Sequence, residues 1–252
     1  MKIGFDPYIT FQEDGHKYFD TEGNNYSSVS NVIKTFKTPF DGQKISYNMA
    51  GGDKNEQDKL LKEWDKKRVD ASNYGTVIHR ELENYFLSGV VHPSLKETAD
   101  DIRAIIQPHK LVMPEKIFYS KGHRVAGTAD LPVLKRSVRI AGKNFDVLDI
   151  GDYKTNTANG IRYSSTYMKN GEWKFGNRML DVCSHLDECE YNSYMIQLSI
   201  YGYMAEMTYD VLIGSLFILQ ILPNGFVNYI HVPYNKLLAK AILDRYVELK
   251  KM

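Results

Sequence analysis

The strongest constraint on the fold is a very apolar run, VLIGSLFILQILP, at residues 211–223. A strand that is hydrophobic along its whole length suits the interior of a sheet whose two faces are both covered. A second strand-like segment, GFVNYIHVPY, follows at residues 225–234, so the pair predicts a hairpin. With 252 residues and 43% apolar side chains, the chain can bury a core of this kind.

Segments with helical character precede and follow this hairpin. The segment at 191–209 is apolar on most sides, which predicts a buried helix, and residues 235–252 predict a charged amphipathic one. Two further helices are expected at 75–88, opening at Gly75, and at 95–109. Residues 41–74 are polar with helical tendency and contain six lysines between Lys44 and Lys67. A solvated helix face is favoured there over a path for nucleic acid.

Alternating apolar and polar residues predict strands elsewhere. The expected strand segments are a hairpin over 3–26 with its turn near Thr21–Asn25, and strands at 116–120, 124–134 and 145–154. No structure is predicted for the polar connection at 155–190, whose basic residues are interleaved with aromatic ones. The order of elements predicts an α/β (α+β) fold with a central mixed β-sheet flanked by helices.

The predicted organisation is an N-terminal β-hairpin and helical segment, residues 1–74, packed on a core of residues 75–252, as one compact domain. Lys and Arg number 32 and Asp and Glu 31, so the net charge of +1 favours no class of partner. Two cysteines, Cys183 and Cys189, are too few for a disulfide framework or a four-cysteine metal cluster. The absence of a long apolar run predicts a soluble, intracellular protein with no membrane partner.

The segment FDVLDIGDYK places Asp152 and Lys154 in the same row as Leu148 and Ile150, which is the row expected to face the core. Charged side chains on such a row cost several kcal/mol unless they are paired or bound to metal. Two interpretations remain open from this segment alone. Either the strand has already reached solvent at residue 152, or it directs two charges into a functional site.

A second carboxylate favours the functional site. Asp130 lies in a strand context in RVAGTADLPVL, and two strand-borne carboxylates can hold a hard cation such as Mg²⁺ or Mn²⁺. His79 could add a nitrogen ligand, and Lys154 could polarise a water molecule or a developing oxyanion. Taken singly, Asp130 could instead belong to a turn at a strand end, and His79 could be a buried helix histidine.

Four short motifs in order resemble the PD-(D/E)XK nuclease superfamily. The motifs are G-x-x-x-H with a later Glu (Gly75, His79, Glu83), G-x-x-D (Gly127, Asp130), D-x-K (Asp152, Lys154) and Q-x-x-x-Y (Gln197, Tyr201). They are most similar to the RecB-type, lambda-exonuclease-like branch, which includes the mitochondrial genome maintenance exonuclease and its phage relatives. The YSSVSNVIKTF segment around Ser28 also resembles the N-terminal part of these enzymes, so the resemblance covers about residues 26–220.

The resemblance implies a restriction-endonuclease-like core and a metal-dependent DNA exonuclease that hydrolyses phosphodiester bonds with Mg²⁺ or Mn²⁺. Asp130 and Asp152 would bind the metal, with His79 and a backbone carbonyl of Tyr153 or Ile150 as further ligands. Lys154 would orient the attacking water and offset developing charge. Glu115, before the strand at 116–120, receives less weight as a ligand.

The remaining candidates surround that centre. Gln197 and Tyr201 would hold Lys154 or contact a phosphate, although a buried polar pair between helix and sheet is an equally good interpretation. Glu83 could support His79. The residues expected to contact nucleic acid are Thr155, Asn156 and Ser28.

The resemblance further implies single-stranded DNA or DNA ends as the substrate, and recombination or replication proteins as partners, in a viral protein of a bacterial cytoplasm. The chain departs from some relatives because it has neither four cysteines for an iron–sulfur cluster nor an ATP-binding loop. Two alternatives are a nucleic-acid-binding protein on the same fold that has lost catalysis, and a hydrolase of small phosphoesters. Polarity, strand preference and oligomeric state are open.

Overall fold

A computed structural model describes residues 2–4, 6–15, 17–155 and 160–252. Its helices are α1 (Val29–Thr35), α2 (Gly42–Met49), α3 (Lys54–Ser88), α4 (Lys96–Ile105), α5 (Glu190–Thr208) and α6 (Lys236–Leu249), with short 3₁₀ turns η1 (Pro93–Leu95) and η2 (Asp181–Cys183). Its strands are β1 (Ile9–Gln12), β2 (Lys17–Asp20), β3 (Asn25–Ser28), β4 (Leu111–Val112), β5 (Lys116–Ser120), β6 (Val125–Ala129), β7 (Leu131–Ile140), β8 (Lys143–Lys154), β9 (Tyr167–Lys169), β10 (Glu172–Lys174), β11 (Val211–Ile221) and β12 (Val227–Val232).

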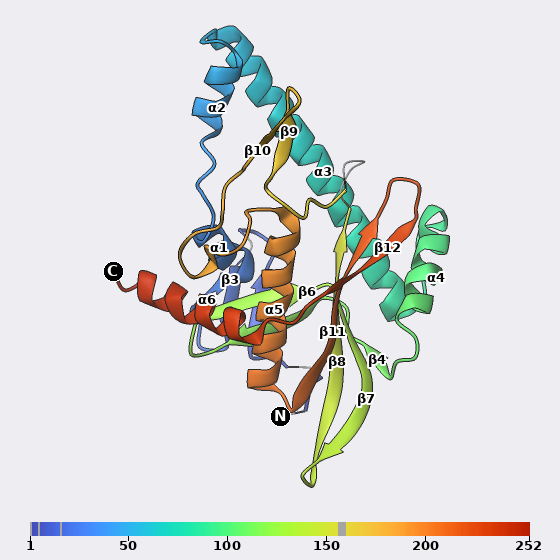
Figure 1. The fold of residues 1–252 in the computed structure, drawn as a ribbon. Coiled ribbons are helices and arrows are strands. Elements are labelled where there is room, and N and C mark those ends of the chain that lie inside the picture. The colour runs from blue at the N-terminus through green and yellow to red at the C-terminus, as the bar shows by residue number, and fades with distance from the viewer. Residues whose placement is uncertain (1, 5, 16, 156–159) are drawn as a thin grey trace.

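The apolar run forms β11, inside a five-stranded sheet of order β12-β11-β8-β7-β4. β11 runs parallel to β8 and antiparallel to β12, so the predicted hairpin is confirmed. Leu216 and Ile218 pack beneath α5 and α6, whereas Phe217 and Leu219 pack against α3 and α4. Helices therefore cover both faces of a mixed sheet (Figure 1), which confirms the predicted fold class.

A second sheet, of order β1-β2-β3-β6-β5, lies beside the first. The chain passes from it into the main sheet between β6 and β7, and Asp130 is the single residue at that junction. The N-terminal segment contains two consecutive hairpins, β1–β2 and β2–β3, where the sequence predicted one. The predicted turn near Thr21–Asn25 is the second of these.

Helix α3 differs most from the prediction, because it begins at Lys54 and not at Gly75. The Asp53 side chain caps its first turn, and Gly89 ends it in the left-handed conformation at φ 78°. Gly75 lies inside the helix, where an ideal Cβ would meet Thr155 Oγ1 at 3.2 Å. The glycine therefore marks a close approach of the chain after β8 and does not mark a helix start.

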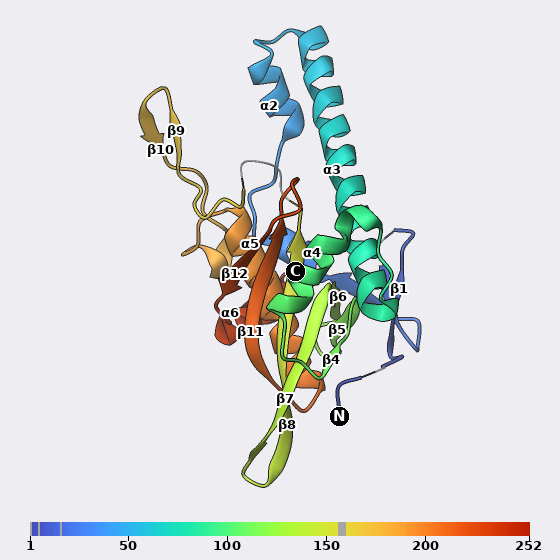
Figure 2. The same cartoon turned by 90° about the vertical axis from the view of Figure 1, so that its right-hand side faces the viewer.

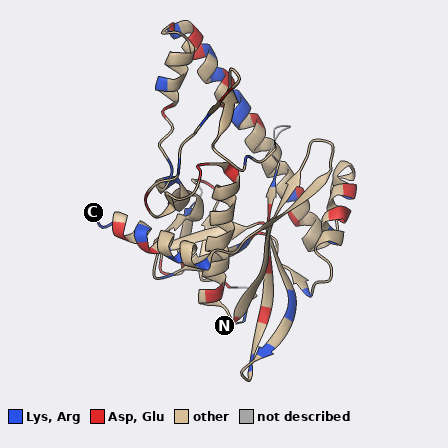
Figure 3. Cartoon of the chain, in the orientation of Figure 1, with Lys and Arg blue, Asp and Glu red and all other residues tan. Residues whose placement is uncertain are grey.

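The first half of α3, residues 54–74, stands clear of the sheets together with α2 (Figure 1). We call these two elements the arm. Its basic residues alternate with acidic ones along the helix (Figure 3), as in the ion pairs Lys59–Glu56 and Arg68–Asp65. The mixed charge agrees with the favoured interpretation of a solvated helix face.

The connection for which the sequence predicted no structure contains a short hairpin, β9–β10. This hairpin projects from the same end of the molecule as the arm (Figure 2) and exposes the aromatic rings of Trp173 and Phe175. Farther along, Cys183 and Cys189 are buried free thiols. Within the described parts of the chain, the helices lack the combination of length and apolar character that crossing a bilayer requires.

Candidate metal centre

Asp130 occupies the junction between the two sheets and is 8% exposed. Its Oδ2 atom accepts a hydrogen bond from the backbone N–H of Tyr153 at 2.8 Å. The preceding residues pair with β5 and the following ones with β8, so the carboxylate is held where the chain changes sheets. Tyr153 thus supports Asp130 through its N–H, while its carbonyl as a metal ligand stays a prediction.

His79 reaches the same place from α3. Its Nδ1 atom lies 3.5 Å from Asp130 Oδ1, and its ring meets the Tyr153 ring edge-on at a centroid distance of 5.5 Å. Glu83, one turn farther along the helix, lines the same hollow as His79. The structure therefore brings together the helix motif and the G-x-x-D motif.

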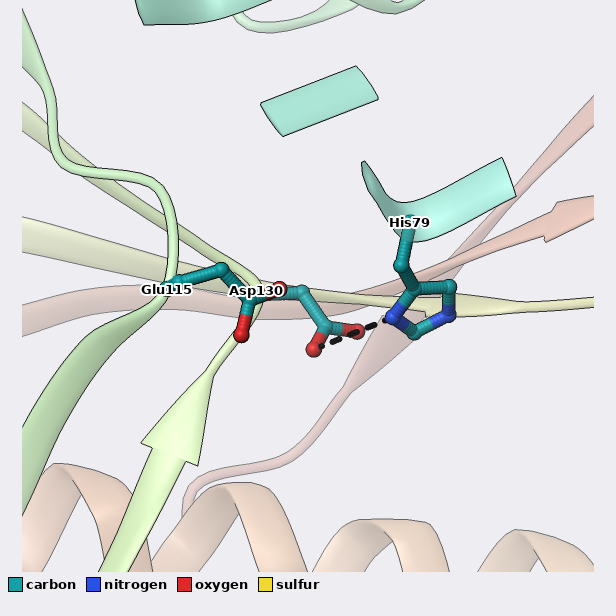
Figure 4. A group of neighbouring side chains, drawn as sticks. All are labelled: His79, Glu115 and Asp130. Atoms are coloured by element: carbon teal, nitrogen blue, oxygen red, sulfur yellow. Dashed lines mark ion pairs between the residues drawn. The ribbon is translucent and has the colours of Figure 1, made fainter. Parts of the chain in front are cut away.

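Glu115 is the third residue of this group, although the sequence gives it less weight as a ligand. Ligand atoms of His79, Glu115 and Asp130 all lie within 4.8 Å of one another (Figure 4). Glu115 adopts a left-handed backbone, φ 52°, which is uncommon for a side chain of this kind. Its N–H donates to the Asp130 carbonyl at 3.2 Å. In the structure β5 pairs Lys116 with Ala129, so one more step places Glu115 opposite Asp130, a position that the sequence indicates only once this register is known.

Crowding of the carboxylates shifts the ionisation of this group. Burial and the charge of Asp130 raise the pKa of Glu115 to about 8. Burial alone would also raise the pKa of Asp130, but attraction to His79 and Lys154 outweighs it and lowers that pKa. For His79, burial opposes protonation, yet the charge of Asp130 still raises its pKa. Burial and the charges of neighbouring groups therefore set the ionisation of all three residues.

Asp152 and Lys154 form a second layer beside this group. Asp152 is 2% exposed, so β8 has not reached solvent at this residue. Its Oδ2 atom forms an ion pair with Lys154 Nζ, which also lies 4.6 Å from the centroid of the Tyr194 ring. Burial and the nearby Asp130 raise the pKa of Asp152 to about 6. Burial opposes the charge on Lys154, but Asp152 and Asp130 outweigh it and raise the lysine pKa.

The Q-x-x-x-Y motif lies on α5 above the same point. Gln197 Nε2 donates to Tyr201 OH at 3.0 Å, and burial raises the pKa of Tyr201 well above its usual value. The Tyr201 ring packs directly on Gly127, where an ideal Cβ would lie 2.7 Å from Tyr201 Cε1 and 2.9 Å from Val29 Cγ2. The glycine of G-x-x-D is therefore required by close packing of β6 against α5.

The candidate nucleic-acid contacts are dispersed around the centre. Ser28 is 5% exposed and caps α1, where its hydroxyl accepts from Asn31 N at 3.2 Å. Thr155 is half-buried beside Gly75 at the end of β8. Asn156 lies outside the described residues.

Two adjoining hollows give access to the group. One, of about 230 Å³, is lined by residues of three of the four motifs, His79, Asp130, Gln197 and Tyr201 among them, together with Ser28 and Glu115. The other, of about 830 Å³, runs along α3 past Gly75, His79, Arg80 and Glu83. The two hollows share His79, Glu115 and Thr128 in their linings.

The donor set fits a divalent cation. Two carboxylates and one imidazole converge, and burial together with the charge of Asp130 raises the pKa of Glu115. Carboxylate oxygens suit Mg²⁺ or Mn²⁺, and the imidazole nitrogen favours Mn²⁺. Asp152 lies just outside this set, but its charge acts on both His79 and Glu115.

Replacing Glu115 by Gln is expected to stabilise the metal-free protein at pH 8 by at least about 1 kcal/mol and to leave it unchanged at pH 4.5. The folded chain keeps a proton on Glu115 that the unfolded chain loses between these values. Stability of the wild type therefore falls as pH rises through this window, and the glutamine removes the fall. Thermal unfolding in EDTA at both pH values measures the effect.

The exposed Glu97 provides the control, because Glu97→Gln should change neither midpoint. Adding Mg²⁺ or Mn²⁺ should reverse the order, since the variant lacks the negative charge of one carboxylate ligand. A Glu115→Gln protein that is less stable than wild type at pH 8 in EDTA would contradict the crowded centre.

Compared with models of known protein families and with curated protein sequences, the chain matches none. Among solved structures it is similar to a crystal structure from Eubacterium rectale described as a "putative exonuclease". That similarity has a TM-score of 0.33 and 12% sequence identity, and it covers 90% of this chain and 79% of the other. Function has to be argued from the site itself.

Proposed function

We propose that this protein is a nuclease that hydrolyses phosphodiester bonds of DNA with the help of a divalent cation, Mg²⁺ or Mn²⁺. The observation that supports it best is the ion pair between the buried Asp152 and the half-buried Lys154, whose side chain is 18% exposed, beside the His79–Glu115–Asp130 group. Removing two charges from water costs several kcal/mol. Charges at the surface would avoid this cost, and apolar side chains in a core would not incur it. A site that binds charged phosphates is a functional reason for a fold to bear this cost.

Within this proposal, His79, Glu115 and Asp130 hold the cation, with Asp152 as a further oxygen donor. The cation would supply Lewis acidity and a more acidic bound water. Asp152 and the Tyr194 ring fix the position of the Lys154 ammonium. The ammonium then donates to the water or to the phosphate oxygen on which negative charge develops.

Gln197 and Tyr201 line the inner hollow, where their polar atoms can bond a phosphate oxygen. Thr155, Ser28 and Asn156 are proposed contacts for the neighbouring backbone. The hollow along α3 leads past Gly75 to His79, which suits an extended strand more than a small phosphoester. We therefore propose exonuclease action on single strands or DNA ends.

We further propose membership of the RecB-type, lambda-exonuclease-like branch of the PD-(D/E)XK superfamily, based on the order of the four motifs in the sequence. The same resemblance is the basis for proposing a role with replication or recombination proteins of a phage in its host's cytoplasm. A nucleic-acid-binding protein that had lost catalysis is the second candidate. The complete set of Asp130, Asp152 and Lys154 disfavours it, because binding alone needs no lysine paired with a buried carboxylate.

Digestion of end-labelled DNA tests the proposal. Single- and double-stranded oligonucleotides carrying a label at the 5′ or the 3′ end are incubated with Mg²⁺, with Mn²⁺ or with EDTA. Cleavage with the cations and none with EDTA is the expected result, and the pattern of labelled products gives polarity and strand preference. Binding without cleavage under all conditions would favour the second candidate instead.

A further inference from the structure

Gln220, near the end of β11, has no place in the motifs and is buried at 4% exposure. Gln220 on β11 pairs with Lys154 on β8. Two residues earlier, Ile218 pairs with Asp152 in the same way. Paired residues of neighbouring parallel strands point to the same face and lie about 5 Å apart. Gln220 therefore extends the row of Asp152 and Lys154 sideways into the next strand.

The hydrogen bonding of this amide is incomplete. Its Oε1 accepts a long bond, 3.4 Å, from Asn228 Nδ2 on β12. Its Nε2 is buried and has no hydrogen-bond partner in the part of the chain that the structure describes. A buried amide hydrogen without an acceptor destabilises a folded protein, so such groups are rare and call for a reason.

The surroundings specify what the missing acceptor should be. The nearest charge in the same row is the Lys154 ammonium, which cannot accept a hydrogen bond. An anion placed beside that ammonium would satisfy both groups. The backbone of Gly160 also comes close, because an ideal Cβ on that residue would lie 3.8 Å from Gln220 Nε2.

We propose that the Gln220 side-chain amide binds an oxygen of a substrate phosphate next to the one that Lys154 serves. The inference rests on the proposed nuclease function and adds a substrate-binding residue from β11. Among the described residues the Gln220 Nε2 atom has no acceptor, and the phosphate oxygen of an entering nucleic-acid backbone would supply one. Gln220 contributes to binding of the substrate at the expense of stability.

Gln220→Met separates this role from a structural one, because it keeps the size of the side chain and removes its donor. The free variant is expected to unfold at a higher temperature than wild type, since an unsatisfied polar group is gone. Binding of a fluorescent single-stranded oligonucleotide, measured by anisotropy in EDTA, is expected to weaken by about tenfold. A structural residue would lose stability instead.

Thr98→Val is the matched control. Thr98 is also buried on the core side, at 3% exposure, but its hydroxyl donates to the Gly225 carbonyl at 2.9 Å. Removing this satisfied donor should lower the unfolding temperature and leave DNA binding as in wild type.

A chemical change in the DNA locates the contact. Oligonucleotides with one neutral methylphosphonate linkage are compared in both proteins. At one linkage beside the cleavage point, the neutral group should weaken binding to wild type but not to Gln220→Met, because the contact is already lost.

The inference is overturned if Gln220→Met is destabilised as Thr98→Val is, or if its DNA binding equals that of wild type. It is also overturned if every linkage affects both proteins alike. These binding measurements are made without a metal, so a wild-type protein that fails to cleave DNA would refute the nuclease function separately.

Discussion

Asp152→Asn is expected to lower metal-dependent cleavage of DNA by about a thousandfold. The substitution removes a negative charge that lies beside the proposed cation and also fixes the Lys154 ammonium. Single-turnover digestion of labelled DNA at saturating Mn²⁺ measures the loss, because at saturation a weakened metal affinity no longer limits the rate.

Asp152→Asn is also expected to be less stable, because it leaves the Lys154 ammonium without its ion-pair partner. Breaking one side of a buried ion pair typically costs about 3–5 kcal/mol. The double variant Asp152→Asn with Lys154→Met removes both charges and should unfold at a higher temperature than the single one. It should be equally inactive, so loss of activity in the double variant cannot be attributed to unfolding.

Asp146→Asn is the matched control on the same strand. Asp146 lies near the far end of β8, where its carboxylate accepts from Ser137 Oγ at 2.5 Å. Activity of this variant should equal that of wild type. Wild-type activity in folded Asp152→Asn would show that the chemistry lies elsewhere.

Lys154→Met is expected to slow the chemical step by about a hundredfold or more while cation binding persists. The ammonium is the positive group that the fold places beside the carboxylates, and Tyr194 and Asp152 hold it there. Its loss removes charge stabilisation from the transition state but removes none of the His79, Glu115 and Asp130 ligands. Single-turnover rates and thermal shifts with Mn²⁺ measure the two properties separately.

Lys143→Met is the control, because Lys143 lies on the same strand, 58% exposed and paired with Asp210 at 2.6 Å. Its activity should be unchanged. If Lys154→Met cleaves DNA at the wild-type rate, or if it loses the thermal shift with Mn²⁺, the role assigned to the ammonium is wrong.

The alternation of FDVLDIGDYK correctly predicted which residues share a face, and the burial of Asp152 answers the question that the sequence left open. A period-two pattern is readable from the sequence because each residue of a strand either faces the core or faces away from it. Position in the sheet is not encoded so locally, and Gln220 shows this, since its proximity to Lys154 depends on the parallel pairing of distant segments.

The sequence gives Glu115 too little weight as a ligand and places a helix start at Gly75, and the two differences have separate reasons. Glu115 required counting the β5–β6 register outward from the turn, beyond the last residue of either strand. The sequence predicts a helix start at Gly75, and a glycine inside a helix costs about 1 kcal/mol relative to alanine. Here the neighbouring Thr155 leaves little room for a side chain, so packing overrides that preference.

The unbroken course of α3 has a mechanical consequence. His79 lies 25 residues after Lys54, so the tip of the arm and the imidazole are joined by about 38 Å of continuous helix. The second half of this helix is packed in the core through Ile78, Leu82 and Tyr85. One unbroken helix therefore connects any contact made at the tip of the arm to one of the groups proposed to hold the cation.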